Sequence, residues 1–480
     1  MEQKTCLVIL DGWGHAKPSM HNAITSAHTP FYNDLVQTEL FTTLHAGAEH
    51  LDLPAGQFGN SEIGHMTIGA GRVFPSDLRR INEQLEQNSL SLPPQNTHLI
   101  GLFSNGGVHS HNQHILLLLK RLIHDTANKI FLHIITDGRD RPIHAFKEDF
   151  QPILSLCNNH PDRIVISTIG GRYFGMDRDK NWDRTNAYMQ QIQSAKGSTS
   201  FLSWLKDYPH NDRSDEFIQP ISFAHTRILD SDNVICCNFR ADRALQILKK
   251  IEELKPHTLL GLTSYPGFSN IKNLFPKTLP THGLGQVVSD NHIQQIRIAE
   301  TEKFAHVTYF FNMLNDKPYS QEERLLIPSE KVASFDQSPK MRAKEITEAV
   351  IQNMPKYGLT VCNFANADMV GHTGNAEATI KAVEDLDTCL GQIFKQCLLT
   401  GTALVITADH GNADEMRLEN GEVSTSHSLA MVPLIICNTK FKALLKDEHH
   451  NLSCIAPTIL DIMGLEKPKQ MQSHSILLCK

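Results

Sequence analysis

Short apolar runs that end in polar, glycine-rich turns recur along this chain and constrain its fold most strongly. Six of them are CLVILDGWG, KIFLHIITDGRD, RIVISTIGGRY, NVICCNFRADR, LTVCNFANAD and ALVITADHGN. Amphipathic segments lie between several runs, for example at Ala343–Met354 and Ala376–Leu399. Continuous apolar strands that alternate with helices are typical of α/β architecture with a mainly parallel sheet. Ligands of such folds bind beyond the carboxyl ends of the strands, so the polar residues after each run are the candidate site residues.

Two segments with prolines or glycines predict the domain boundaries. VFPSD at 73–77 precedes a helical stretch, and prolines and glycines crowd together at 273–285. We therefore expect one domain made from both chain ends, residues 1–76 and 280–480, with a second domain, residues 77–279, inserted into it. The length of 480 residues suits two large domains or three smaller ones.

The charge balance and the apolar runs exclude several classes of partner. The chain has 45 Lys and Arg against 52 Asp and Glu, a net charge of -7 that gives no general attraction to nucleic acid or anionic membranes. No apolar run reaches the roughly 18 residues that a membrane span needs. The first run is short and ends at Asp11, which is typical of a buried strand and not of a signal peptide. We expect a cytoplasmic protein that acts on a small molecule, with no nucleic acid or membrane partner.

Carboxylates and imidazoles follow three of the predicted strands. Asp11 follows CLVIL, and Asp409 and His410 follow ALVIT. Asp368 and His372 lie four residues apart in ADMVGH, so on a helix both would share one face and could bind one ion. Mixed Asp and His ligands suit Mn²⁺ or Zn²⁺. The simpler alternative is that Asp11 only caps the next turn.

Ser61, in GNSEIGH, and His427, in STSHS, are candidate site residues only because other predicted metal ligands accompany them. Two adjacent metal ions would stabilise the attacking and leaving oxygens of phosphoryl transfer, and coordination can make a serine hydroxyl nucleophilic. As alternatives, Ser61 could serve as a helix N-cap, and His427 could be a solvated loop residue. A helix N-terminus would also favour an arriving phosphate, so the first alternative is compatible with catalysis.

Arginines in the strand-end turns of the middle segment predict an anion site. Arginine binds phosphate and carboxylate groups through two parallel hydrogen bonds. A single loop arginine is usually a solvated surface charge, but here arginines recur beside Gly and Asp at three strand ends. The candidates are Arg139, Asp140, Arg172, Arg178, Arg240 and Arg243, together with His109, His111 and Lys303.

Eight segments occur in an order that a known family shares. They are GNSEIGHMTIGAGR, GGVHSH, TDGRD, GGRYFGMDRDKNWDR, NFRADR, AETEKFAHVTYFFN, NFANADMVGHTG and TADHGN. With them the chain resembles, nearly end to end, the cofactor-independent phosphoglycerate mutases, metalloenzymes of the alkaline phosphatase superfamily. The resemblance implies an α/β fold in which both chain ends form an alkaline-phosphatase-like, metal-binding domain. The insert would be a second α/β domain, the substrate-binding transferase domain, and the protein would be a monomer.

The resemblance also implies an activity and a role for each candidate residue. The activity is interconversion of 3-phosphoglycerate and 2-phosphoglycerate in glycolysis and gluconeogenesis, an isomerase reaction with two Mn²⁺ ions and no 2,3-bisphosphoglycerate. One ion would be held by Asp368, His372 and His427, and the other by Asp11, Ser61, Asp409 and His410. Ser61 would form a phosphoserine intermediate, and Asp140 would act as acid or base. Arg240, Arg243 and Lys303 would offset charge on the transferring group. The substrate would be bound by His109, Arg139, Asp140, Arg172, Arg178, Arg240, Arg243 and Lys303.

The chain departs from the family pattern after His427. The family usually continues with Thr or Ser, a variable residue and Asn-Pro-Val-Pro, whereas this chain reads SLAMVP at 428–433. The Asn and the first Pro are absent, and the loss of a proline should loosen this loop. The competing interpretations are a phosphopentomutase or a plain phosphomonoesterase of the same superfamily, and a catalytically inactive metal-binding protein.

Overall fold

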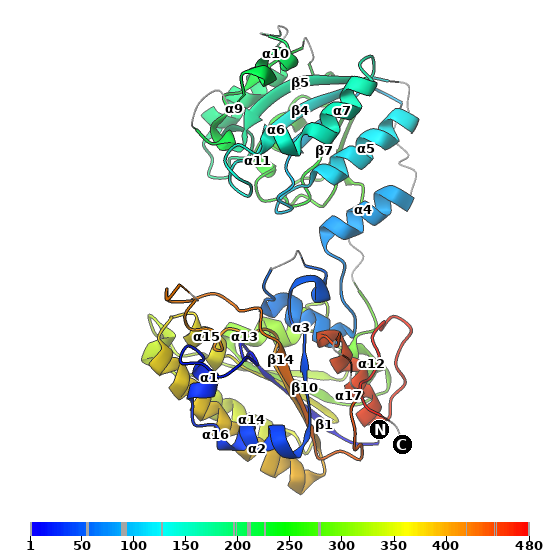
Figure 1. The fold of residues 1–480 in the computed structure, drawn as a ribbon. Helices are drawn as coiled ribbons and strands as arrows, with labels where there is room; N and C mark the ends of the chain where they lie inside the picture. The colour runs from blue at the N-terminus through cyan, green and yellow to red at the C-terminus, as the bar shows by residue number, and fades with distance from the viewer. Residues whose placement is uncertain are drawn as a thin grey trace. The chain divides into compact units, whose positions relative to one another are not determined.

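Two compact units make up this chain in the computed structural model (Figure 1). The structure describes residues 2–53, 57–87, 94–125, 128–194, 197, 199–208, 213–224, 227–276, 280–418, 420–445, 447 and 449–478. The terminal unit comprises Met1–Phe74 and Leu279–Lys480, and the inserted unit is Pro75–Thr278. Part of the second expected connector, residues 277–279, lies outside the described residues.

The terminal unit is built on a seven-stranded sheet with the order β11-β10-β12-β1-β13-β14-β2. Its strands are β1 (Thr5–Leu10), β2 (Leu40–Leu44), β10 (Gln295–Glu300), β11 (Glu322–Ile327), β12 (Leu359–Phe364), β13 (Ala403–Thr407) and β14 (Val432–Cys437). The first five strands in the sheet order are parallel, and β14 is antiparallel to both of its neighbours. The carboxyl ends of β10, β12, β1 and β13 therefore meet along one edge of the sheet.

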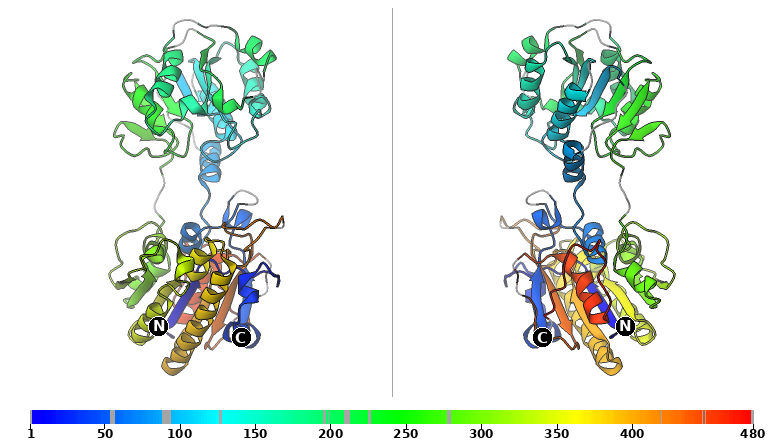
Figure 2. Two further views of the ribbon diagram at one scale, coloured as in Figure 1. Left: turned by 90° about the vertical axis from the view of Figure 1, so that its left-hand side faces the viewer. Right: turned by 90° about the vertical axis from the view of Figure 1, so that its right-hand side faces the viewer.

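Helices cover both faces of this sheet (Figures 1 and 2). On one face lie α14 (Ala343–Asn353) and α16 (Ala376–Thr400), and on the other α12 (Leu284–Asp290) and α17 (Ile455–Met463). The other helical elements of this unit are α1 (Ala23–Ser26), α2 (Pro30–Thr38), η1 (Ala48–Leu51), α3 (Ser61–Ala70), α13 (Thr301–Ala305), η3 (His306–Phe310), η4 (Phe335–Gln337), α15 (Asn366–Gly371) and η5 (Leu452–Cys454). Because the central strands are covered on both faces, every residue of β1 is buried.

The inserted unit has its own seven-stranded sheet, with the order β6-β5-β4-β3-β7-β8-β9. Its strands are β3 (Thr97–Leu102), β4 (Ile130–Thr136), β5 (Ile164–Gly171), β6 (Ile221–Ser222), β7 (Asn233–Cys236), β8 (Thr258–Gly261) and β9 (Ile271–Asn273). All pairs are parallel except β5 with β6. Its helical elements are α4 (Asp77–Gln87), α5 (Asn112–Asp125), α6 (Phe146–Asp149), α7 (Gln151–Asn159), α8 (Arg172–Gly175), α9 (Trp182–Ile192), α10 (Phe201–Lys206), η2 (Asp215–Phe217) and α11 (Leu245–Glu252).

Neighbouring residues of these strands face two separate apolar clusters, as the alternation of side chains along a strand requires. Leu99 packs in the cluster that contains α5 and α7, whereas Ile100 packs in the cluster that contains α9 and α11. The same alternation holds for Ile134 and Ile135 in β4. Both faces of the sheet are therefore apolar, which explains why its strands read as continuous hydrophobic runs in the sequence.

The predicted α/β architecture with mainly parallel sheets is confirmed. Each of the six apolar runs forms a strand, and the two amphipathic segments form α14 and α16. Among the described residues, no helix combines the length and the apolar character that crossing a bilayer requires.

Candidate metal centre and anion-binding cluster

The carboxyl edge of the terminal sheet brings together the residues predicted to bind metal. Asp11 follows β1, while Asp409 and His410 follow β13. Asp368 comes from α15, which follows β12, and Lys303 comes from α13, which follows β10. All five side chains are buried. Because β12, β1 and β13 are adjacent, three carboxylates converge at one place.

The side chains of Asp368, His372 and His427 form a triangle of ligand atoms. The two Nε2 atoms of His372 and His427 lie 3.2 Å apart, and they lie 3.2 and 3.4 Å from Asp368 Oδ1. His372 donates its Nδ1–H to Thr425 O at 2.7 Å, and His427 donates its own to Gly59 O at 2.8 Å. In neutral rings both Nε2 atoms then present lone pairs, which repel each other unless a cation lies between them. A tetrahedral site with bonds of about 2.1 Å places its ligand atoms about 3.4 Å apart, so this triangle fits a metal ion.

Ser61 lies in a second group of ligand atoms. Its Oγ lies 3.1 Å from Asp11 Oδ1 and 2.9 Å from His410 Nε2. His410 Nε2 also lies 3.4 Å from Asp409 Oδ2. Asp409 Oδ2 is buried and accepts no hydrogen bond from the part of the chain that the structure describes. A buried acceptor without a donor is expected where a cation binds, so the donor set also fits a metal here.

The start of α3 decides between two roles for Ser61. The N-cap of α3 is Asn60, whose side chain accepts a hydrogen bond from the Ile63 backbone N–H at 2.9 Å. Ser61 is the first helical residue, and its hydroxyl lies in the ligand group. The alternative that Ser61 is the N-cap is therefore wrong.

Lys303 contacts both groups of ligand atoms. Its ammonium donates to Asp11 Oδ1 at 2.7 Å, to Ser61 Oγ at 2.7 Å and to Asp368 Oδ2 at 2.6 Å. Burial alone would lower the pKa of Lys303, but Asp11, Asp368 and Asp409 outweigh burial and raise it. The family resemblance placed Lys303 with the substrate-binding residues, and the structure places it among the metal-ligand candidates.

The electrostatics of this centre also favour bound cations. Burial and the nearby Asp409 raise the pKa of Asp11. Burial would also raise the pKa of Asp368, but Lys303 and the two imidazoles hold that pKa well below its ordinary value. Three buried carboxylates thus face one ammonium group, and further positive charge would stabilise them.

The loop after His427 is held by hydrogen bonds although the family's Asn and Pro are absent. The Ser428 backbone N–H donates to Gly411 O at 3.0 Å, and Ser428 Oγ donates to Asp414 Oδ2 at 2.7 Å. These contacts join the loop to the segment that carries His410.

The carboxyl edge of the inserted sheet carries the predicted anion-binding residues. These residues are His109 after β3, Arg139 and Asp140 after β4, Arg172 and Arg178 after β5, and Arg240 and Arg243 after β7. The four strands are adjacent in the order β5-β4-β3-β7. The side chain of His111, in the same turn as His109, accepts a hydrogen bond from the Gln113 backbone N–H at 3.2 Å.

Two aspartates that are not among the predicted site residues, Asp137 and Asp242, organise this arginine cluster. Arg172 is buried, and its Nη1 lies 2.7 Å from Asp137 Oδ1 and 2.6 Å from Asp140 Oδ2. Asp242 receives Arg178 Nη1 at 2.8 Å and Arg240 Nε at 3.1 Å. Asp137 lies in TDGRD and Asp242 in NFRADR, so both could have been predicted from their positions close to the arginines in these motifs.

Burial and neighbouring positive charges lower the pKa of two residues in this cluster. Burial and the nearby Arg172 lower the pKa of His109 to about 4. Burial, together with the guanidinium groups of Arg178, Arg172 and Arg139, lowers the pKa of Arg243. Such mutual destabilisation of positive charge is relieved by a bound anion.

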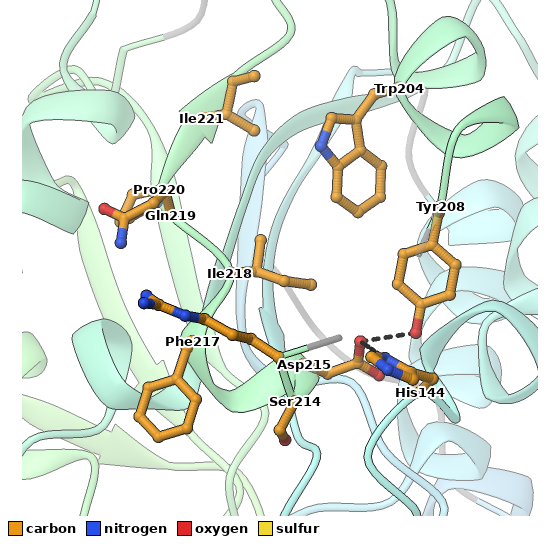
Figure 3. Close-up of a pocket in the computed structure, with 11 residues that line it drawn as sticks. His144, Trp204, Tyr208, Ser214, Asp215, Phe217, Ile218, Gln219, Pro220 and Ile221 are labelled. Carbon is orange, nitrogen blue, oxygen red and sulfur yellow. Dashed lines mark hydrogen bonds and ion pairs between the residues drawn. The ribbon is translucent and has the colours of Figure 1, made fainter. Parts of the chain in front are cut away.

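A cavity of about 350 Å³ in the inserted unit lies beside these turns, and none of the predicted residues lines it (Figure 3). The segment Ser214–Ile218 forms part of its wall. Ser214 Oγ donates to Gly138 O at 2.6 Å, and the Gly171 N–H donates to Ile218 O at 2.7 Å. This wall segment therefore supports the two turns that carry Arg139 and Arg172.

Comparisons with known proteins cover the whole chain. A family model described as "Metalloenzyme superfamily" matches residues 3–467. A 2,3-bisphosphoglycerate-independent phosphoglycerate mutase of Vesicomyosocius okutanii is 39% identical, over 100% of this chain and 99% of that protein. The protein of the same name from Wolinella succinogenes is 40% identical, over 98% of this chain and 99% of that protein. A crystal structure of Leishmania mexicana phosphoglycerate mutase at low cobalt concentration aligns with a TM-score of 0.59 and 27% identity, over 100% of this chain and 98% of the other.

Proposed function

We propose that this chain, which belongs to the family of 2,3-bisphosphoglycerate-independent phosphoglycerate mutases, interconverts 3-phosphoglycerate and 2-phosphoglycerate through a phosphoserine on Ser61. The members of this family are isomerases, and the chain also belongs to the broader metalloenzyme superfamily. The observation that carries the role of Ser61 is the set of groups around its Oγ. Asp11, His410 and Lys303 all lie within 3.1 Å of this atom. A serine needs such activating partners to act as a nucleophile.

In this proposal the terminal unit is the metal-binding domain and the inserted unit is the substrate-binding transferase domain. Two divalent ions would be held by the two groups of ligand atoms described above, and the family resemblance implies that these ions are Mn²⁺. When bound, they supply Lewis-acid stabilisation of the negative charge on the reacting oxygens.

In the first half-reaction Ser61 Oγ bonds to phosphorus, and the bond between phosphorus and the 3-oxygen of the glycerate breaks. Asp11 Oδ1, at 3.1 Å from Ser61 Oγ, takes the proton that leaves the Ser61 hydroxyl, and Lys303 donates a hydrogen bond to Ser61 Oγ at 2.7 Å. The N-terminus of α3 favours the arriving phosphate. Asp140 supplies the proton to the departing 3-oxygen.

In the second half-reaction the 2-oxygen of the glycerate attacks phosphorus and the bond between phosphorus and Ser61 Oγ breaks. Asp11 returns its proton to Ser61 Oγ, which regenerates the hydroxyl. Asp140 takes the proton from the 2-hydroxyl, which restores its starting state. Arg172 helps to hold the glycerate, and Arg240, Arg243 and Lys303 offset charge on the transferring group. The glycerate must stay bound between the two steps, because its loss would expose the phosphoserine to water and convert the mutase into a phosphatase.

The product formed from 3-phosphoglycerate tests this proposal. Purified, Mn²⁺-loaded protein is incubated with 3-phosphoglycerate in the absence of 2,3-bisphosphoglycerate, and the products are resolved by ³¹P NMR. We expect 2-phosphoglycerate as the product. Release of free phosphate alone would indicate a phosphomonoesterase, and no turnover at all would indicate an inactive metal-binding protein.

Three further parts of the proposal follow from the family resemblance. They are a role in glycolysis and gluconeogenesis, a cytoplasmic location and a monomeric state. Sedimentation equilibrium tests the last part directly, with an expected mass near the 53.9 kDa of one chain.

A further inference from the structure

His65 is a buried histidine that lies against the metal centre without belonging to the proposed ligands. It is fully buried, and its Nδ1 lies 2.9 Å from Ser61 O and 3.3 Å from Asp409 Oδ2. Its Nε2 lies 3.0 Å from Asn363 Nδ2. Asn363, also fully buried, is near the end of β12 and donates from the same nitrogen to Asp11 Oδ2 at 2.7 Å.

The chemistry of these partners fixes the proton on the His65 ring. A backbone carbonyl only accepts hydrogen bonds, so His65 Nδ1 carries the hydrogen that is donated to Ser61 O. The Asn363 amide nitrogen only donates, so His65 Nε2 accepts. Turning the Asn363 amide over would place its oxygen against the Asp11 carboxylate, which is unfavourable. Both ring nitrogens are therefore engaged, although Asp11, His65 and Asp409 have ligand atoms within 4.8 Å of one another.

The geometry points to His65 and Asn363 as a pair of positioning residues for the metal centre. Asn363 holds Asp11, and His65 holds the first turn of α3 at Ser61 and faces the Asp409 carboxylate. The pair thereby joins the nucleophile to two carboxylates that come from β1 and β13. This inference rests on the proposed function, because it assumes that the centre binds divalent ions.

The general behaviour of metal sites gives the expected size of the effect. Groups that hydrogen-bond to the ligands, without binding the ion themselves, fix the orientation of those ligands, and their loss typically costs about 10- to 100-fold in metal affinity. The alternative is that His65 is simply a histidine packed in the core. His306 provides the comparison, because its ring centroid lies 5.4 Å from that of His65 while its buried Nδ1 has no hydrogen-bond partner among the described residues.

Mn²⁺ titrations of five proteins test the inference. Isothermal titration calorimetry, with free Mn²⁺ counted by EPR, is applied to the wild type, His65→Ala, His65→Asn, Asn363→Leu and the control His306→Ala. We expect two bound ions in the wild type and a loss of about 10- to 100-fold in affinity for one of them in His65→Ala and Asn363→Leu. His65→Asn keeps an N–H donor near Ser61 O, so it should lose less affinity than His65→Ala. His306→Ala should stay within about twofold of the wild type.

Circular dichroism of the metal-free proteins separates these effects from unfolding. If His65→Ala does not fold, His65→Asn and Asn363→Leu decide the question. Wild-type affinity in the folded His65 and Asn363 variants, or an equal loss in His306→Ala, would overturn this inference alone. A wild type that binds no Mn²⁺ would overturn the proposed function and, with it, this inference.

Discussion

Ser61 is one of several buried serines, and its surroundings set it apart. Its Oγ lies within 3.1 Å of a carboxylate, an imidazole and an ammonium group. Ser61→Ala should lower mutase turnover by at least about 10³-fold, because no other group would replace the proposed nucleophile. Mn²⁺ affinity should fall much less, since the proposed aspartate and histidine ligands would remain. Enolase-coupled rates and Mn²⁺ titration measure the two quantities.

Ser289 provides a matched control for this substitution. It is buried in the same unit, and its Oγ is hydrogen-bonded to Ser320 Oγ at 2.9 Å. Ser289→Ala should leave turnover close to that of the wild type. Substantial residual turnover in Ser61→Ala would exclude Ser61 as the nucleophile.

At the residue scale, local motifs identified the candidates whose chemistry is visible in the sequence. Asp11, Asp409 and His410 were predicted because each directly follows an apolar run. The roles of His65 and Asn363 were not predicted, because they depend on a contact between residues 298 positions apart. Such a contact depends on the order of the strands in the folded sheet, which no short stretch of sequence predicts.

At the scale of single elements, α3 lies unusually close to the turn after β13. A Cβ atom on Gly64 would lie 2.8 Å from both the Cβ and the carbonyl oxygen of Asp409. Gly64→Ala should therefore push α3, and with it Ser61, away from Asp409. A displacement of about 1 Å can cost about 10²-fold in rate, so we expect a loss of that order in kcat together with weaker Mn²⁺ binding.

Gly391 is the matched control, because it also lies within a helix. A Cβ on this residue of α16 would meet its nearest neighbour, Phe31, at an ordinary 3.6 Å. Gly391→Ala should keep full activity and raise stability by about 0.5–1 kcal/mol, as expected from helix propensity. Full activity in Gly64→Ala would show that the close approach of α3 is not needed.

A chain of buried hydrogen bonds crosses the sheet of the inserted unit. His98 Nε2 lies 3.3 Å from Asp232 Oδ2, His98 Nδ1 lies 2.9 Å from His133 Nε2, and His133 Nδ1 lies 2.9 Å from Thr168 Oγ1. Burial and the neighbouring His98 hold the pKa of His133 well below its ordinary value. His133 therefore stays neutral in the folded protein where the unfolded chain binds a proton.

This pKa shift gives a pH dependence of stability with a defined sign. Below the ordinary histidine pKa of about 6.5, the unfolded chain takes up a proton at His133 that the folded chain does not. The free energy of unfolding should fall as the pH drops from 7.5 to 5.5, with His133 contributing at most about 1.4 kcal/mol per pH unit. Urea unfolding at both pH values measures this fall. His133→Asn should show a shallower fall than the wild type, and equal falls would contradict the assignment.

The elements themselves were largely predictable, because their apolar periodicity is strong. The start of α3 shows the limit of such predictions. GNS offers two adjacent residues of the N-cap type, and both Asn and Ser suit that position. The choice of Asn60 leaves Ser61 inside the helix, and only the packing of α3 against the site decides between the two.

At the scale of the whole molecule, each unit has its own apolar core. Calorimetric unfolding in EDTA should therefore resolve two transitions. Mn²⁺ at about 100 times its dissociation constant should stabilise the terminal unit by about 2.7 kcal/mol per site and leave the other transition in place. Equal shifts of both transitions would contradict the assignment of the metal sites to the terminal unit alone.

The origin of the terminal unit from both ends of the chain has a consequence for its synthesis. β1 lies in the middle of its sheet, and both of its partners, β12 and β13, come from the last third of the sequence. The insert is continuous, so it has all of its strands while the ribosome is still making β12. The nascent protein must therefore carry β1 without its neighbouring strands for most of translation. Asp11 and Ser61, which are synthesised early, can reach their final surroundings only after β12 and β13 have been made.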